Sequence, residues 1–157
     1  MTRAIAPTTL ATIYMTMFVL GTAPAARADG PRACTDASLR GSFGFTSQGA
    51  LVAGFPPPVI GPFGEVGRQT FDGRGNTDGA ATLSGNGNIR RVTFLGTYVV
   101  NPDCTGVMTL YVSPLGATVD LDFVIDDNGT ELRAIVTGAG VVETRVYRKQ
   151  VSRERED

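Results

Sequence analysis

The chain has 157 residues, of which 42% are hydrophobic and 18% charged, and its formal net charge is −1. This length suits one domain with a single core, and a charge so close to neutral argues against nucleic acid as a partner. The chain contains two cysteines and no histidine, so the sequence predicts neither a metal site nor a cofactor.

Residues 1–28 have the pattern of a secretory signal peptide. Arg3 precedes an apolar stretch from Leu10 to Leu20, and the alanines before Asp29 fit the small-residue rule for cleavage. We expect cleavage before Asp29, with a cut after Ala25 as the nearest alternative, and a secreted or periplasmic location. The apolar stretch is well short of the roughly 20 residues that cross a bilayer as a helix, so no membrane span is predicted.

The rest of the chain divides into a predicted domain, residues 29–149, and a charged flexible tail, residues 150–157. Without the signal peptide, the chain has 12 basic and 15 acidic side chains, which gives a net charge of −3. Export brings Cys34 and Cys104 into an oxidising compartment, where they are expected to form a disulfide. This bond closes a loop of about 70 residues and should stabilise the domain by about 4 kcal/mol.

Turn residues recur along the domain at the 8 to 12 residue spacing that is typical of β-sandwiches and barrels. The intervals between them predict strands near residues 39–48, 64–71, 77–84, 90–100, 106–113, 118–126, 130–137 and 141–149. Turns are expected near 72–76, 85–88, 101–103, 114–117, 128–129 and 138–140. No helical period of useful length lies between the turns, so we expect an all-β domain.

Side-chain parity predicts how these strands pair, because a shift of one residue sends every side chain to the opposite face. One face of the paired strands stays apolar if three connections have the right length. These are a two-residue turn at 128–129 and three-residue loops at 138–140 and 101–103. The expected pairs are Ile125–Leu132, Phe123–Ala134, Leu121–Val136, Val136–Val142, Ala134–Thr144, Leu132–Val146, Phe94–Leu110 and Val92–Val112.

An even-numbered loop, such as the four residues 114–117, is needed to keep Leu110 and Leu121 on the same face. With that loop, five consecutive strands form a meander with one apolar face. A meander of eight strands can close on itself and abolish its edges. The sequence therefore predicts a single eight-stranded antiparallel up-and-down β-barrel with one disulfide.

Several short motifs, rich in glycine and aromatic residues, carry a family resemblance. They comprise Cys34, Leu39, Gly41, Phe43, Gly44 and Phe45, then residues 71–75 (FDGRG), 96–98 (GTY) and 102–106 (PDCTG). The chain resembles small exported bacterial proteins with an allene oxide cyclase barrel-like, calycin-type domain, over nearly all of residues 34–149. The resemblance implies an eight-stranded barrel whose relatives include cyclases and dirigent-like proteins. The motifs are structural, and no catalytic residue is carried over from them.

The predicted register gives the barrel an apolar interior. Its expected lining comprises Phe43, Phe45, Phe94, Tyr98, Met108, Leu110, Leu121, Phe123, Val136 and Val142. Barrels of about eight strands either fill the interior with side chains or hold one small ligand. The sequence leaves both a packed core and a cavity for a small apolar ligand open.

Most charged side chains of the predicted strands are expected to point outward, which counts against acid–base catalysis. They are Asp120, Asp122, Asp126, Glu131, Arg133, Glu143 and Arg145. The strand near 64–71 is the exception, and both of its registers stay open. With Phe71 inward, Glu65 and Gln69 would face the interior; the opposite register would bring in Val66, Arg68 and Thr70. Glu65 or Arg68, with Tyr98 as a neighbouring donor, is therefore the candidate catalytic site.

Residues 50–63 form a stiff apolar connection that is rich in proline. Such a segment can plug one end of the barrel or serve as a contact surface, and contact through Phe55 and Phe63 would give a homo-oligomer. Our leading interpretation of the chain is an exported barrel that is structural or binds a small apolar molecule. The alternatives are a cyclase-like enzyme that acts inside the barrel, and assembly through residues 50–63.

Overall fold

The computed structural model describes residues 33–151. The predicted signal peptide with its cleavage site, and the charged tail beyond residue 151, lie outside the described residues. In the described range, no helix is long and apolar enough to cross a membrane.

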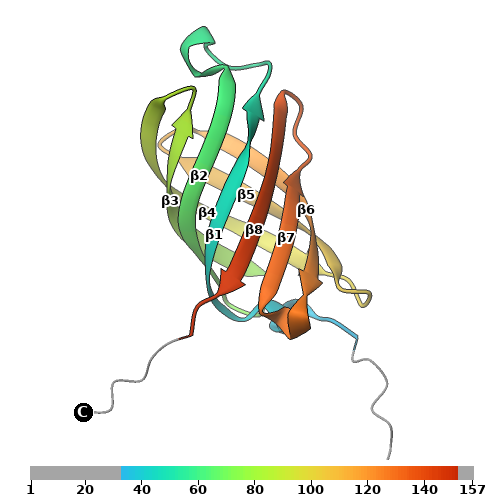
Figure 1. Cartoon of the computed structure of the whole chain (residues 1–157). Helices are drawn as coiled ribbons and strands as arrows, with labels where there is room; N and C mark the ends of the chain where they lie inside the picture. Colours follow the sequence, from blue (N-terminus) through green and yellow to red (C-terminus); the bar gives the residue numbers. More distant parts are fainter. Residues whose placement is uncertain (1–32, 152–157) are drawn as a thin grey trace, which may run out of the picture. The chain divides into compact units, whose positions relative to one another are not determined.

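The described chain forms a closed barrel in which every strand pairs antiparallel with the next and β1 pairs with β8 (Figure 1). Its strands are β1 (Gly41–Leu51), β2 (Gly61–Phe71), β3 (Asn76–Gly85), β4 (Asn88–Val100), β5 (Thr105–Ser113), β6 (Ala117–Asp126), β7 (Glu131–Val136) and β8 (Val141–Lys149). Three short 3₁₀ helices accompany them: η1 (Asp36–Leu39), η2 (Pro57–Val59) and η3 (Asp127–Gly129). The predicted eight-stranded up-and-down barrel is confirmed.

The up-and-down order gives the barrel two different ends. One, the disulfide end, consists of residues 33–40 with the connections 72–75, 101–104 and 127–130. The other, the loop end, consists of the connections 52–60, 86–87, 114–116 and 137–140. The two ends lie at opposite poles of the strands in Figure 1.

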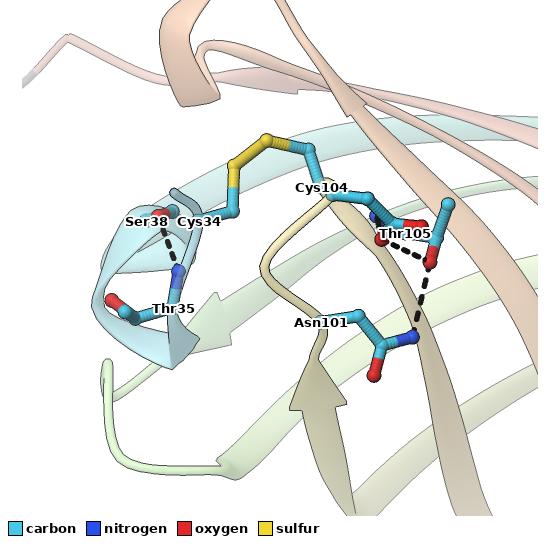
Figure 2. The surroundings of a disulfide bond; sticks show 7 residues. Cys34, Thr35, Ser38, Asn101, Cys104 and Thr105 are labelled. Carbon is cyan, nitrogen blue, oxygen red and sulfur yellow. Dashed lines mark hydrogen bonds between the residues drawn. A yellow bond between two sulfur atoms is a disulfide. The ribbon is translucent and has the colours of Figure 1, made fainter. Parts of the chain in front are cut away.

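The disulfide end is covered by the segment that carries η1. The predicted bond between Cys34 and Cys104 is present and ties this segment to the β4–β5 connection (Figure 2). The amide of Cys34 also donates a hydrogen bond to the carbonyl of Pro102, at 3.1 Å. Leu39, at the end of η1, is completely buried in the core. The segment therefore closes this end of the interior by covalent, polar and apolar contacts together.

Interior positions follow the alternation expected of a strand with one buried face. Of the ten side chains that the sequence assigned to the interior, nine are buried, and eight of these are Phe43, Phe45, Phe94, Tyr98, Met108, Leu110, Leu121 and Phe123. Val136 is buried as well, whereas Val142 is 61% exposed and points outward. The fully buried side chains nearest the disulfide end include Phe71 and Leu132, and their close packing makes that half of the barrel solid.

Three of the predicted strand pairings, β4–β5, β5–β6 and β6–β7, leave the side chains on their expected faces of the sheet. The pairs Ile125–Leu132, Phe123–Ala134 and Leu121–Val136 are present as expected. Four residues, 113–116, separate the last pair of β5 and β6, so the even-numbered loop is confirmed. Between β4 and β5 the prediction was wrong by two residues, because the connection is longer than three: Phe94 pairs with Val112 instead of Leu110. A shift of two leaves every side chain on its predicted face.

The predicted register of β8 was wrong by one residue, and this error changes which side chains of β8 face the interior. Leu132 pairs with Tyr147 rather than Val146, and Ala134 pairs with Arg145 rather than Thr144. The four residues 137–140 connect β7 to β8, not three. Since a one-residue shift inverts a strand, the predicted outward direction of Glu143 and Arg145 was wrong, and both side chains are buried inside the barrel.

The apolar connection is shorter than predicted, because Ala50, Leu51 and residues 61–63 belong to β1 and β2. Its remaining residues belong to the loop end, where the Asn88 side chain donates a hydrogen bond of 2.7 Å to the carbonyl of Pro58. Phe55 is half-buried, and Phe63 lies in β2 rather than in a loop. Oligomerisation through these two aromatic residues stays a prediction.

Candidate functional site

The barrel interior holds a row of polar residues across three neighbouring strands. In the observed register Arg145 of β8 lies opposite Ser47 of β1, which in turn lies opposite Glu65 of β2. Glu143 precedes Arg145 by two residues and therefore faces the same side. The pairing of the first strand with the last thus brings together residues that are far apart in the sequence.

Glu65, Glu143 and Arg145 form what we call the ion cluster. The Arg145 Nε lies 2.6 Å from Glu143 Oε1, and its Nη2 lies 3.4 Å from Glu65 Oε2. The Ser47 hydroxyl donates a longer hydrogen bond, 3.3 Å, to the same Glu65 oxygen. The exposed fractions of Glu65, Glu143 and Arg145 are only 9%, 4% and 5%. Such burial of three ionisable groups is costly unless they are paired.

Aromatic side chains line the cluster on the side of the disulfide end. The guanidinium carbon of Arg145 lies 5.5 Å from the centre of the Phe45 ring, a distance that allows a cation–π interaction. The Phe45 ring centre is 5.0 Å from that of Tyr147, which is completely buried. Within residues 33–151, the Tyr147 hydroxyl has no hydrogen-bond partner of good geometry. It is close enough to Arg145 for the two groups to influence each other's pKa.

Burial dominates the electrostatics of the cluster. Loss of hydration raises the pKa of Glu65 above its ordinary value; Arg145 opposes this rise, and Glu143 adds to it. The geometry explains why the opposition is incomplete, since Arg145 is closer to Glu143 than to Glu65. Burial also raises the pKa of Tyr147, to about 12. Burial works against the charge of Arg145, yet Tyr147 and the two carboxylates raise its pKa further, so it stays a cation.

Towards the loop end, the cluster is followed by apolar side chains that are only half-buried. These side chains, which we call the rim, are Phe63, Leu83, Val119 and Val141. On β2 the order from the loop end is Phe63, Glu65 and then the buried Gln69; on β8 it is Val141, then the ion cluster, then Tyr147. The ion cluster therefore lies between a solvent-accessible apolar rim and a solid core.

The three catalytic candidates from the sequence lie in three different places. Glu65 belongs to the ion cluster, so the register with Phe71 inward is the observed one. Arg68 points outward and is exposed. Tyr98 is buried near the disulfide end, where its hydroxyl donates to the carbonyl of Asp36 at 3.1 Å and accepts from the Gly73 amide at 3.0 Å. Burial raises its pKa, but both hydroxyl contacts hold η1 and a turn in place.

Sequence reasoning missed Glu143, Arg145, Ser47 and Tyr147 as parts of one site. One signal was available: if Glu65 faces inward, a buried carboxylate needs a cation or donors nearby. Arg145 could supply that cation once β8 is inverted. Within residues 33–151, no group of three histidine, cysteine, aspartate or glutamate residues could hold a metal ion.

Two hollows lie on the outside of the barrel. The larger, of about 620 Å³, crosses β5 to β8 over side chains such as Val107, Ile135 and Val146. The smaller, of about 440 Å³, crosses β2 to β5 near Val66 and Arg91. Both are wide open to solvent, and neither contains the buried carboxylates of the ion cluster, although Arg145 borders the larger one.

No protein-family model and no curated protein matches the sequence. Solved structures of similar fold include a redesigned β-barrel, mFAP1, bound to DFHBI, with 19% identity over 76% of this chain and 100% of that chain, at a TM-score of 0.54. Another is the redesigned β-barrel b11L5F_LGL, with 18% identity over 74% of this chain and 95% of that chain, at a TM-score of 0.51. At these identities the likeness concerns the fold alone, and the resemblance to allene oxide cyclase barrels stays a prediction.

Proposed function

We propose that the barrel binds one small, largely apolar molecule through its loop end, with the ion cluster contacting the polar group of that molecule. The observation that carries this proposal is the position of the ion cluster, buried directly beneath the half-buried rim. Ligand sites are typically apolar pockets in which a few polar groups fix the orientation of the ligand.

The energetics of the cluster support a role beyond stability. Replacing a buried ion pair by apolar side chains of similar size is often neutral or stabilising. Stability alone therefore gives no reason for two carboxylates and a guanidinium in the interior. Ionisable groups with shifted pKa values in a concave place are instead typical of functional sites. The pKa of Glu65 is shifted by burial in this way.

The two ends of the barrel support access from one side only. The disulfide end is closed by η1, Leu39 and the Cys34–Cys104 bond, whereas the rim at the loop end is half-exposed. The likeness to mFAP1 adds that a barrel of this fold can be found with a small molecule, there DFHBI. The disulfide fits a protein of an oxidising compartment, and we propose that the protein is exported.

The experiment is a titration of the disulfide-bonded protein with the neutral apolar dye Nile red, which fluoresces in apolar surroundings. Leu83→Asp puts a charge on the rim, and Leu95→Asp is its matched control because Leu95 lies on the outside of the barrel and is exposed. We expect dye emission with the natural chain and with Leu95→Asp, and its loss with Leu83→Asp. Equal emission from all three would place the dye on the outer surface and reject the proposal.

A second candidate function, cyclase-like chemistry inside the barrel, is favoured by Glu65 alone. A buried carboxyl group with a raised pKa can act as a general acid or base near neutral pH. The test is to extract the bound molecule from purified protein, return it to the natural chain and to Glu65→Gln, and follow its mass and retention. Recovery of the molecule unchanged from the natural chain would reject catalysis and leave binding.

A further inference from the structure

We infer that the ligand's polar group is a cation, such as a protonated primary amine at the end of an apolar body. This inference rests on the proposed binding function and names the chemical class of the ligand. It follows from the charges, the hydrogen-bond acceptors and the apolar surroundings of the ion cluster.

The charges of the interior do not balance. Of the buried side chains in the described range, Glu65 and Glu143 are acidic and Arg145 is basic; the other buried polar ones, Ser47, Gln69 and Thr77, are neutral. Lys149 lies over the Phe43 ring near the disulfide end and is exposed, so it does not complete the cluster. With both carboxylates ionised, the interior carries one negative charge in excess. In a medium of low polarity an excess charge attracts a counter-charge strongly.

The excess charge falls on Glu65. Arg145 makes its short contact, 2.6 Å, with Glu143 and reaches Glu65 only at 3.4 Å. Both contacts of Glu65, from Arg145 and from Ser47, are made by the same oxygen, Oε2. Neither of these two contacts uses the other oxygen, Oε1. Oε1 is therefore the oxygen of this carboxylate that a donor group of the ligand would reach.

A second polar group, the Tyr147 hydroxyl, is close enough to Arg145 and Glu65 for their charges to affect its pKa. The Tyr147 hydroxyl is completely buried and has no hydrogen-bond partner of good geometry within the described chain. Its oxygen can accept a hydrogen bond. An ammonium group has three donors and no acceptor, so Glu65 Oε1 and the Tyr147 oxygen suit it.

Other polar groups suit the cluster less well. A carboxylate would need the Arg145 guanidinium, which two carboxylates already share, and it would add a second excess negative charge. A neutral hydroxyl can bond to Glu65 but leaves the excess charge uncompensated. We expect the rest of the ligand to be apolar, because the rim side chains Phe63, Leu83, Val119 and Val141 offer no polar atom to it and Arg90, which pairs with Leu83, is exposed.

The test compares octylamine, 1-octanol and octanoate, which share one alkyl chain and differ in the charge of the head group. Each is titrated at pH 7 against the protein with Nile red bound, and displacement of the dye gives its affinity. Because hydrogen bonds to charged groups are stronger than neutral ones, we expect octylamine to bind at least about tenfold more tightly than 1-octanol. Octanoate should bind most weakly.

Two variants identify the group responsible. Glu65→Gln keeps the size of the side chain and should lower the octylamine affinity about tenfold or more while leaving that of 1-octanol unchanged. Glu131→Gln is the matched control, because Glu131 pairs with Arg148 on the exterior, at 3.2 Å. It should change neither affinity.

The outcomes separate the two claims. If Nile red shows no binding inside the natural barrel, the proposed function fails, and this inference fails with it. If the dye binds there but 1-octanol or octanoate equals octylamine, or none of the three displaces it, the cationic ligand is rejected and the binding function stands. An unchanged preference in Glu65→Gln would likewise overturn the role of Glu65.

Discussion

Replacing Arg145 by methionine should be among the most damaging single substitutions in the barrel. The methionine keeps much of the apolar stem but removes the charge, so that Glu65 and Glu143 stay buried with no cation between them. Removal of one partner from a buried ion pair costs about 3–5 kcal/mol. For a domain of this size that loss lowers the melting temperature by roughly 12–20 °C.

The assay is urea unfolding at pH 7 with the disulfide intact. The triple variant Glu65→Gln, Glu143→Gln, Arg145→Met leaves no buried charge and should recover most of the lost stability. Arg133→Met is the matched control on the exterior. Arg133 forms an ion pair of the same length with Asp126, 2.6 Å, but is exposed, so its replacement should lower the stability far less than that of Arg145. A loss below about 1 kcal/mol in Arg145→Met, or a triple variant no more stable than the single one, would refute the reasoning.

Three further predictions concern stability. Replacing Cys34 and Cys104 together by serine should cost about 4 kcal/mol in urea unfolding, and an unchanged midpoint would contradict this value. Because burial raises the pKa of Glu65 in the folded state, the stability difference between the natural chain and Glu65→Gln should shift in favour of the natural chain as the pH falls from 7 towards 4.5; a constant difference would show that Glu65 titrates normally. Gly67→Ala should lower the free energy of unfolding by about 1–3 kcal/mol, since its Cβ would lie 2.6 Å from a carbonyl oxygen of β3. Gly64→Ala is the control: the nearest atom to its Cβ is 3.9 Å away, so its free energy of unfolding should lie within about 0.5 kcal/mol of that of the natural chain. Equal effects of the two substitutions would reject this explanation.

The sequence predicts most of the fold because the barrel is a chain of local hairpins. Turn residues mark the ends of the strands, and alternation marks their faces; Asn128, for example, adopts the positive φ that its turn requires. The error of two residues in the predicted β4–β5 register did not change which side chains face the interior, because a shift of two residues leaves each side chain on the same face of the sheet. Closure itself was also predictable, since eight strands with one apolar face gain by burying it.

Most of the candidate site could not be predicted from the sequence, for a physical reason. Strand β8 alternates two sets, Val142, Thr144 and Val146 against Glu143, Arg145 and Tyr147. Hydrophobicity alone favours burial of the first set, and the structure buries the second. The deciding interaction lies with Glu65, about 80 residues earlier in the chain, and local pattern contains no information about so distant a partner.

The pairing of β1 with β8 has a consequence for how the barrel closes. Of the eight described strands, these two alone pair without being neighbours in the sequence, so no hairpin turn sets their register. A shift of β8 by one residue, which would change its pairing with β7 as well as with β1, would bury Val142 and Val146 and expose Glu143 and Arg145. Hydrophobicity alone would favour that wrong alignment. The row from Arg145 through Ser47 to Glu65 spans this junction and exists only in the observed alignment. We expect charge pairing, rather than apolar burial, to decide how the last strand meets the first.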